Sequence, residues 1–176
     1  RRISIVLLIC VSVFCLGPGT WYFLNRQTGP IYEFNYDRDQ QGIADIFQNN
    51  WYWLIADNNE YDPEFMMKHH APNSYDPFYV GKLKIKVLRE NCDGKDTFIG
   101  FTTYYMLSPT IGRIQFVAIN PEFRGKRYGE KLTEHALKDL KSMGATMVKI
   151  LTRVNNAAAL KLYNRIGFKE TGRDDK

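Results

Sequence analysis

The sequence predicts a single α/β or α+β domain in which helices pack on one sheet. Two observations predict it. Strand-like segments follow one another between residues 82 and 119, as in an antiparallel meander, and after residue 130 helical and strand periods alternate. The length of 176 residues agrees, because it is enough for one domain and short for two.

The composition is that of an ordinary globular protein. Apolar residues make up 44% of the chain and charged residues 24%, which excludes a disordered tail, a collagen-like repeat and a multi-span transporter. The three cysteines exclude a small domain framed by disulfides. The net charge of +5 hints at an anionic ligand, but it is too mild to indicate a nucleic-acid-binding surface.

The first 24 residues differ from the rest. Residues 3–24 contain no Asp, Glu, Lys, Arg or His, Arg1 and Arg2 precede them, and Trp21 and Tyr22 stand near their end. A membrane-spanning helix needs about 20 apolar residues and often ends in such aromatic residues. We therefore expect a single-pass membrane anchor over residues 1–24, a linker over 25–30 and the folded domain over 31–176. A cleaved signal peptide followed by export, and a buried strand or helix of the main domain, are the alternatives.

The first part of the folded domain combines a strand, a helix and a long loop. Residues 31–34 fit a short strand, and Ile43, Ile46 and Phe47 have the i, i+3, i+4 spacing of a helix. Residues 58–77 hold three prolines, which predicts a loop with a short helix at 64–68.

The meander follows. Apolar residues alternate with lysines over residues 82–87, Asp93-Gly94 indicates a hairpin turn, and residues 97–106 are aromatic and β-branched. Residues 113–119 form the third strand, which Pro121 ends.

The last third changes to helical spacing. Leu132, Ala136, Leu140 and Met143 mark an amphipathic helix, which Gly144 ends. Residues 146–151 fit a strand, residues 156–166 fit a helix that Gly167 ends, and residues 168–171 could begin a last strand.

The segment between the third strand and the first of these helices carries an anion-site pattern. It reads Arg124, Gly125, Lys126, Arg127, Tyr128, Gly129, Glu130. The first N–H groups of a helix have no internal partner, and the helix dipole favours negative charge there. Glycines let a phosphate approach the backbone, so the pattern indicates a pyrophosphate site. An ordinary strand–helix turn with solvated bases is the alternative.

A second motif follows the next strand, and the two together carry a resemblance. Asn156, Ala159, Leu162, Tyr163, Gly167 and Phe168 fit the pattern Asn-x-x-Ala-x-x-Leu-Tyr-x-x-x-Gly-Phe, while Arg124 and Gly129 fit Arg/Gln-x-x-Gly-x-Gly/Ala. The chain thus resembles the GNAT superfamily of acyl-CoA-dependent N-acetyltransferases, most clearly over residues 112–168.

The resemblance implies a fold, a reaction and a set of site residues. The GNAT fold is a mixed, mostly antiparallel twisted sheet flanked by helices. Acetyl-CoA is the expected acyl donor, without a metal, and the acceptor amine attacks the thioester directly in a ternary complex. Tyr163 matches the general acid for the leaving thiolate. The expected acetyl-CoA contacts are Val117, Ala118, Ile119, Arg124, Gly125, Lys126, Arg127, Tyr128, Gly129, Glu130, Asn156 and Ala159.

Several of these residues also fit a purely structural role. Asn156 resembles the family's contact to the pantetheine arm, and it also has the chemistry of a helix N-cap. Tyr163 could instead be a helix residue packed against the sheet. The aromatic run Trp51-Tyr52-Trp53 is expected in the core, with a wall of the acceptor pocket as the second possibility.

Two features depart from the family. Arg127 stands where the family loop has a glycine, and no general base is evident among Gln115, Asn120, Glu33, Glu122, His69, His70 and Tyr104. These features motivate an alternative, a catalytically inert acyl-CoA-binding or scaffold domain. The apolar start motivates another, an enzyme for a longer acyl chain or a lipid-linked acceptor. Since acetyl-CoA is expected inside cells, the domain is placed on the cytoplasmic side of the membrane, although Arg1 and Arg2 favour the opposite orientation.

Overall fold

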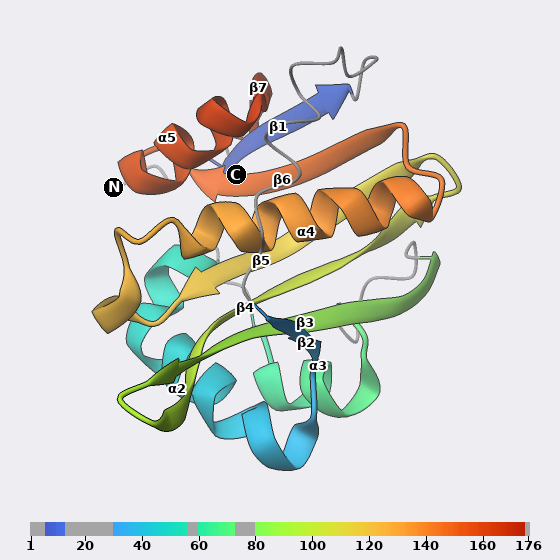
Figure 1. Cartoon of the computed structure of the whole chain (residues 1–176). Coiled ribbons are helices and arrows are strands. Elements are labelled where there is room, and N and C mark those ends of the chain that lie inside the picture. Colours follow the sequence, from blue (N-terminus) through green and yellow to red (C-terminus); the bar gives the residue numbers. More distant parts are fainter. Residues whose placement is uncertain (1–5, 13–29, 56–59, 73–79, 175–176) are drawn as a thin grey trace.

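The computed structural model describes residues 6–12, 30–55, 60–72 and 80–174, and Figure 1 shows their arrangement. Within these residues seven strands form one sheet in the order β2-β3-β4-β5-β6-β1-β7. The strands are β1 (Val6–Ser12), β2 (Ile31–Glu33), β3 (Val80–Cys92), β4 (Lys95–Ser108), β5 (Ile111–Ile119), β6 (Met147–Arg153) and β7 (Lys169–Asp174). The helices are α2 (Tyr36–Leu54), α3 (Pro63–His69), the short 3-10 helix η1 (Pro121–Phe123), α4 (Tyr128–Ser142) and α5 (Ala157–Ile166).

The strands from β2 to β5 form the expected antiparallel meander, and β5 and β6 are parallel. The crossover between β5 and β6 is α4, as a parallel connection requires. The predicted mixed, mostly antiparallel sheet with flanking helices is therefore confirmed, and the predicted helix near residues 64–68 is α3.

Helices cover both faces of the sheet (Figure 1). On one face Ile43 and Phe47 of α2 and Met66 of α3 pack against residues of β3, β4 and β5 such as Ile85 and Phe101. On the other face α4 and α5 pack against Tyr104, Ile114, Val148 and Ile150. The apolar stripe predicted for α4 is confirmed at Leu132, Ala136 and Leu140, which are fully buried, but it is wrong at Met143, which caps the C-terminus of the helix and is 38% exposed.

The structure places part of the apolar N-terminal segment inside the sheet. β1 pairs antiparallel with β6 from Val6↔Arg153 to Ser12↔Met147, and its other edge pairs with β7. The expected membrane anchor is therefore not supported; for residues 6–12 the structure shows the alternative of a strand in the main domain. Among the helices of the described residues, none has the length and apolar character to cross a bilayer. Residues 13–24, with Trp21 and Tyr22, and the predicted linker up to residue 29 lie outside the described part.

A buried ionic cluster joins α2 to the meander. Asp39, which is fully buried, accepts hydrogen bonds from the Asn35 N–H (2.9 Å), from Arg38 Nε and Nη2 (2.8 Å each) and from Arg89 Nη1 (2.9 Å). Burial pushes the pKa of Asp39 up, but the bonds from Arg38 and the Asn35 backbone, with the charges of Arg38 and Arg89, lower it below its ordinary value. Arg89 Nε also donates to Asp96 at 2.9 Å. The start of α2 is thereby tied to β3 and β4.

The Asp39→Asn variant tests this cluster. It leaves the buried Arg89 with only the exposed carboxylate of Asp96, so the free energy of unfolding should fall by about 3–5 kcal/mol, measured by urea denaturation at pH 7. The lowered pKa of Asp39 means that its contribution is present above the unfolded value and is lost as the pH falls through the folded one. The difference between wild type and variant should therefore shrink below about pH 4. Asp96→Asn is the control: its carboxylate is 65% exposed, and it should cost less than about 1 kcal/mol. Equal effects of both variants would contradict the assignment.

Candidate active site

The site begins where β5 and β6 stop pairing. The parallel pairs run from Ile111↔Met147 to Ile114↔Ile150, and among the described residues none follows. At the same place β5 has a bulge toward β4, since Tyr104 pairs with Ile114 while Thr103 pairs with Phe116, which leaves Gln115 as the extra residue. A bulge bends its strand and increases the local twist. The two strands therefore separate just beyond Gln115.

A cavity of about 720 Å³ lies at this separation, within the size range of small-molecule sites. It is lined by the second half of β5, the end of β6, the segment before α4, the first turns of α4 and α5, and the end of α2. Three stretches that are far apart in the sequence, at residues 50–54, 115–130 and 151–165, thus meet around one space.

Nearly all predicted site residues line this cavity. They are Tyr163, Val117, Ala118, Ile119, Arg124, Gly125, Arg127, Tyr128, Gly129, Glu130, Asn156 and Ala159. Lys126 does not line it; the Lys126 side chain is exposed, and its Nζ lies 5.5 Å from the ring centroid of Phe123, which does. The structure therefore brings the two sequence motifs together, as the resemblance implies.

The segment before α4 has a left-handed backbone at two positions. Gly125 has φ = 80° and Arg127, the residue before the first turn of α4, has φ = 64°. Glycine adopts this conformation freely, but for other residues it costs about 1 kcal/mol or more. Arg127 replaces the glycine of the family pattern, but the backbone at this position keeps the conformation that favours glycine.

Arg124 holds this segment against α2. Its Nε donates to the Ile119 carbonyl at 3.2 Å, and its Nη2 donates to Asn50 Oδ1. Asn50 has non-helical dihedral angles within α2 (φ = −133°), and its Nδ2 donates to the Ile46 carbonyl at 2.8 Å. The guanidinium expected to bind phosphate is therefore also a link between the segment and the kink of α2. The Arg127 side chain, by contrast, has no hydrogen bond or ion pair to the described residues, and only the Arg127 carbonyl is bonded, accepting from the Lys131 N–H at 3.2 Å.

Two other predicted contacts have structural partners. Glu130 accepts from Arg165 Nη2 at 2.8 Å, which joins α4 to α5. The Tyr128 hydroxyl donates to Glu90 at 2.6 Å, and this hydrogen bond is the main reason that the pKa of Tyr128 is raised to about 12. Gly129 lets the helices approach, because a Cβ there would lie 3.3 Å from Leu162 Cδ2.

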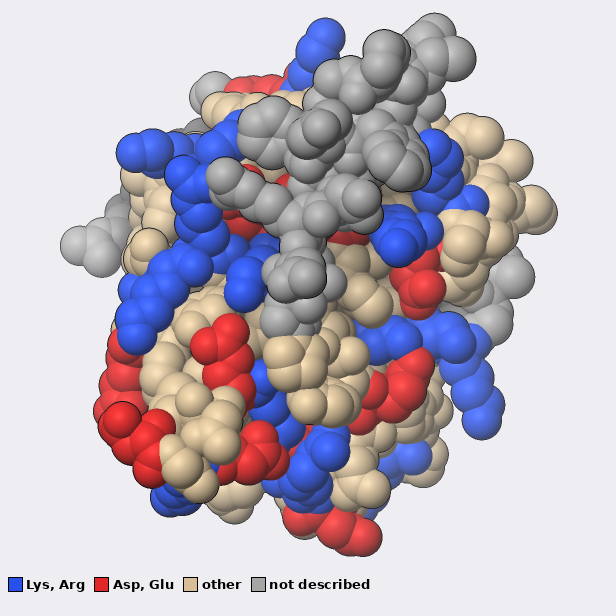
Figure 2. Space-filling view, in the orientation of Figure 1, with Lys and Arg blue, Asp and Glu red and all other residues tan. Residues whose placement is uncertain are grey.

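Four basic side chains of the described residues line the cavity. Arg127, Lys161 and Arg165 line it, together with Arg124. Figure 2 shows Lys and Arg gathered where α5 and the start of α4 reach the surface, while elsewhere on this face they are mixed with acidic side chains. This distribution fits a multiply charged anion bound at one end of the cavity.

Asn156 caps the N-terminus of α5. Its Oδ1 accepts from the Ala159 N–H at 3.1 Å, so the helix N-cap is confirmed. The cap uses only the oxygen, and the amide nitrogen donates to no described residue. Asn156 therefore has a donor left for a ligand in the cavity.

Tyr163 lies deeper in the same cavity. It is 5% exposed and its ring packs 5.5 Å from that of Phe168, so the alternative of a packed helix residue is also realised. Burial raises the pKa of the phenol above its ordinary value. The phenol is thus a neutral hydrogen-bond donor at pH 7, and its hydroxyl has no partner among the described residues.

The end of α2 forms the opposite wall. The expectation that Trp51, Tyr52 and Trp53 lie in the core is wrong: each is 42–47% exposed. The run lies beyond the kink at Asn50. Trp53 lines the cavity with Phe116, so the second possibility, an acceptor-side wall, agrees with the geometry.

Tyr52 and Arg153 hold this end of α2 in place. The Arg153 guanidinium lies 4.0 Å from the Tyr52 ring centroid, and Arg153 Nη2 donates to the Ile55 carbonyl at 2.7 Å. Asn155 Nδ2 donates to the Tyr52 hydroxyl at 2.9 Å. The wall that carries Trp53 is therefore fastened to the end of β6.

Among the residues weighed as a general base, only Gln115 lines the cavity. Glu33 pairs with Lys86, and the Tyr104 hydroxyl donates to Asp139 at 2.6 Å on the α4 face. Within the described residues there is also no group of three or more His, Cys, Asp or Glu that could hold a metal ion.

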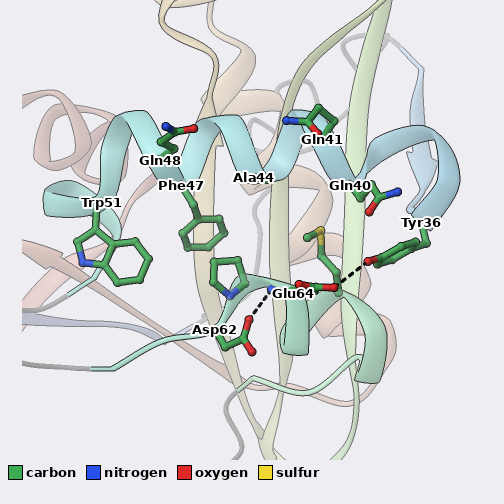
Figure 3. Close-up of a pocket in the computed structure, with 11 residues that line it drawn as sticks. Tyr36, Gln40, Gln41, Ala44, Phe47, Gln48, Trp51, Asp62 and Glu64 are labelled. Carbon is green, nitrogen blue, oxygen red and sulfur yellow. Dashed lines mark hydrogen bonds between the residues drawn. The ribbon is translucent and has the colours of Figure 1, made fainter.

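A second hollow, of about 430 Å³, lies between α2 and α3. Figure 3 shows Phe47 and Trp51 of α2 pointing toward α3, with Asp62 at the start of α3. The Tyr36 hydroxyl donates to Glu64 at 3.4 Å. This hollow contains none of the predicted site residues, and it lies on the other side of α2 from Asn50 and Trp53.

Comparison with known proteins agrees with this geometry. The profile of the Acetyltransferase (GNAT) family matches residues 40–168, which is more than half of the chain. Mycothiol acetyltransferase of Saccharopolyspora erythraea is 30% identical over 76 residues, which cover 43% of this chain and 25% of that protein. The [ribosomal protein bS18]-alanine N-acetyltransferase of Salmonella typhimurium is 35% identical over 54 residues, 31% of this chain and 36% of that protein. The matched segment thus spans well under half of either relative.

Solved structures show the same fold. A GCN5-related N-acetyltransferase from Sphaerobacter thermophilus aligns with a TM-score of 0.65 at 14% identity, over 98% of this chain and 50% of that one. The ribosomal-protein-S18-alanine N-acetyltransferase of Escherichia coli aligns with a TM-score of 0.57 at 18% identity, over 81% of this chain and 79% of that one.

The Arg127→Gly variant tests the strain before α4. Because glycine adopts φ = 64° freely, the variant should be more stable by up to about 1 kcal/mol, after the larger entropy of its unfolded chain is subtracted. Arg127→Ala is the matched control, since it removes the charge but keeps a Cβ in the left-handed conformation. Thermal melts should rank glycine above arginine and alanine. A glycine variant less stable than the alanine variant would show that the conformation is not strained.

Substitutions of Asn156 distinguish helix capping by its side-chain oxygen from ligand binding by its side-chain amide nitrogen. Asn156→Ala should lower the free energy of unfolding by about 1 kcal/mol, because the first turn of α5 loses its acceptor. Asn156→Ser keeps a capping oxygen and should remain within about 0.5 kcal/mol of wild type, but it lacks the amide donor. If the amide binds ligand, both variants should lose acetyl-CoA affinity by about tenfold in calorimetric titration. Wild-type affinity in the serine variant would leave Asn156 a helix cap alone.

Proposed function

Because the chain belongs to the acetyltransferase (GNAT) family, we propose that it transfers an acetyl group from acetyl-CoA to a primary amine by direct attack in a ternary complex. The observation that supports this most is the single cavity at the separation of β5 and β6, which both sequence motifs line. In this proposal the segment before α4 binds the phosphates, the backbone of Val117 to Ile119 contacts the thioester, and Trp53 faces the acceptor; each of these regions lines the cavity.

The donor half fits acetyl-CoA. The first N–H groups of α4 and the left-handed backbone at Gly125 offer main-chain donors to the pyrophosphate, and an added Cβ at Gly125 would meet nothing within 4 Å, so the approach is open. Arg127 and Lys161 add positive charge. The amide nitrogen of Asn156 is placed to donate to the pantetheine arm, and the backbone of Val117 to Ile119, which no longer pairs with β6, can donate to the thioester carbonyl.

The proposed chemistry needs no covalent enzyme intermediate. The amine nitrogen forms a bond to the carbonyl carbon, the carbonyl oxygen takes up negative charge, and the carbon–sulfur bond then breaks. The thiolate of CoA receives a proton and the amine loses one, so the proton count balances. Tyr163 donates to the sulfur. Its raised pKa makes full proton transfer to a thiolate, whose thiol has a pKa near ~8.5, energetically uphill, so we assign it chiefly a hydrogen bond that strengthens as charge develops.

The names of the relatives support a range of acceptors. They include an enzyme named for mycothiol, one named for a ribosomal-protein alanine and one named as an N-alpha-acetyltransferase. We propose an acceptor from this range, an amine of a small molecule or the α-amine of a polypeptide. A second candidate is an acyl-CoA-binding domain without turnover. Arg127 favours it, because a residue with a Cβ and a left-handed backbone stands in the expected phosphate-binding segment where the family has glycine.

Acetyl-CoA titration and thiol release test the proposal on the full 176-residue chain. The wild type should bind acetyl-CoA and release CoA thiol with at least one member of a panel of small amines, amino sugars and alanine-starting peptides. Tyr163→Phe should lower kcat by about 100-fold or more and leave acetyl-CoA affinity within about threefold. Tyr36→Phe, in the other hollow, makes the same chemical change and should have no effect.

Two other outcomes of these assays would argue against an acetyltransferase. Binding of acetyl-CoA without thiol release from any amine would favour the inert domain. Absence of binding by the folded wild type would contradict both functions.

A further inference from the structure

Gln115, which lines the cavity, has a buried side-chain atom without a hydrogen-bond partner among the described residues. Gln115 lines the cavity at the bulge of β5, and its Oε1 is buried and accepts no hydrogen bond from the described residues. A buried carbonyl oxygen left unpaired costs about 1–3 kcal/mol. Such an atom in a ligand cavity indicates that a ligand supplies the missing donor.

The neighbours of Gln115 determine which end of its carboxamide is unpaired. Nε2 donates to the Pro72 carbonyl at 2.7 Å and reaches the Tyr61 hydroxyl at 3.5 Å. A carbonyl can only accept, so turning the amide over would place two acceptor oxygens against each other. Pro72 therefore fixes the nitrogen on its own side and leaves Oε1 as the unsatisfied atom. Burial raises the pKa of Tyr61, which keeps its hydroxyl neutral beside the amide.

The location of Gln115 indicates which part of a ligand it would meet. It lies two residues before Val117, where the thioester carbonyl is expected, and the aromatic side chains of Phe116 and Trp53 line the same cavity. Gln115 therefore lies beside the expected thioester region, in the cavity that the acceptor-side wall also lines. In the proposed reaction the nucleophilic nitrogen of the acceptor occupies that place.

We propose that Gln115 Oε1 accepts a hydrogen bond from an N–H of the acceptor amine and so orients the lone pair of its nitrogen toward the thioester carbon. This inference rests on the proposed function and adds a substrate contact to it. A primary amine has two N–H groups and one lone pair, so one N–H can bind Oε1 while the lone pair attacks. A carboxamide does not take up protons, and Gln115 is therefore not the base. The substrate form that reacts is the neutral amine.

This assignment predicts a particular pH dependence. With ethylamine as the probe, kcat/KM should rise tenfold per pH unit up to the pKa of the amine, near that of lysine at about 10. The titratable or charged groups that line the cavity or face Gln115 are Tyr61, Arg124, Arg127, Tyr128, Glu130, Lys161, Tyr163 and Arg165. The pKa values of the tyrosines are raised by burial or, in Tyr128, by Glu90. The tyrosine titrations therefore lie above the range of the expected rise.

Two substitutions of Gln115 test the contact. Gln115→Met has similar length but no oxygen, and it should lower kcat/KM for ethylamine by about tenfold or more while the dissociation constant of acetyl-CoA stays within about threefold. Gln115→Glu keeps an acceptor oxygen and adds a base, so its kcat/KM should exceed that of the wild type at pH 7 and rise less steeply with pH. Gln48→Met, on exposed α2 surface at the other hollow, is the matched control and should behave as wild type.

A measurement without turnover keeps the inference testable if a variant folds poorly. In the wild type with CoA bound, the side-chain amide resonances of ¹⁵N-labelled Gln115 can be identified by their absence in Gln115→Met. They should shift when ethylamine is added at pH 10 and shift far less when the same total concentration is added at pH 7. No shift at pH 10 would overturn the proposal.

The kinetic results distinguish two kinds of failure. Wild-type turnover that Gln115→Met leaves unchanged, or a Gln115→Glu profile identical to that of wild type, would overturn the Gln115 contact and leave the acetyltransferase function standing. No thiol release by the wild type with ethylamine or any amine of the panel would remove the proposed function and the inference together.

Discussion

The separation of β5 from β6 at the Gln115 bulge is the constraint on which the rest of the site depends. Parallel pairing ends at Ile114 and Ile150, so the backbone of β5 beyond that point faces open space instead of a neighbouring strand. The same separation places the first turns of α4 and α5, the next α-helices after β5 and β6, on either side of the opening. The bulge at Gln115 thus accounts both for the cavity and for the backbone N–H groups that face it.

Long-range contacts then keep the cavity walls in place. Arg124 ties the segment before α4 to Asn50, Arg153 ties β6 to the end of α2, and Glu130 ties α4 to α5 through Arg165. At the other end of α2 the buried Asp39 joins the helix to β3 and β4 through Arg89. The residues expected to hold the acyl donor and the wall expected to face the acceptor therefore belong to one connected framework.

Two residues that line the cavity have an unfavourable backbone conformation or an unsatisfied polar atom. Arg127 has a backbone that favours glycine, and Gln115 has a buried oxygen without a partner. Strain and unsatisfied polar groups concentrate at functional sites, because a ligand rather than the fold completes them. Both departures lie where the sequence raised a question, at the replaced glycine and at the absent base. The tertiary structure identifies one dihedral angle, the φ of Arg127, and one atom, Gln115 Oε1, at these two positions.

The sequence by itself determined the order of the elements, the fold class and the composition of the cavity, because periodicity, helix ends and motif spacing are local properties of the chain. It could not place residues 6–12 beside β6, since a short apolar run fits a buried strand as well as a helix. Nor could it show that Trp53 is exposed or that Gln115 Oε1 lacks a donor. Burial and hydrogen bonding depend on segments distant in sequence, so only the tertiary structure decides them.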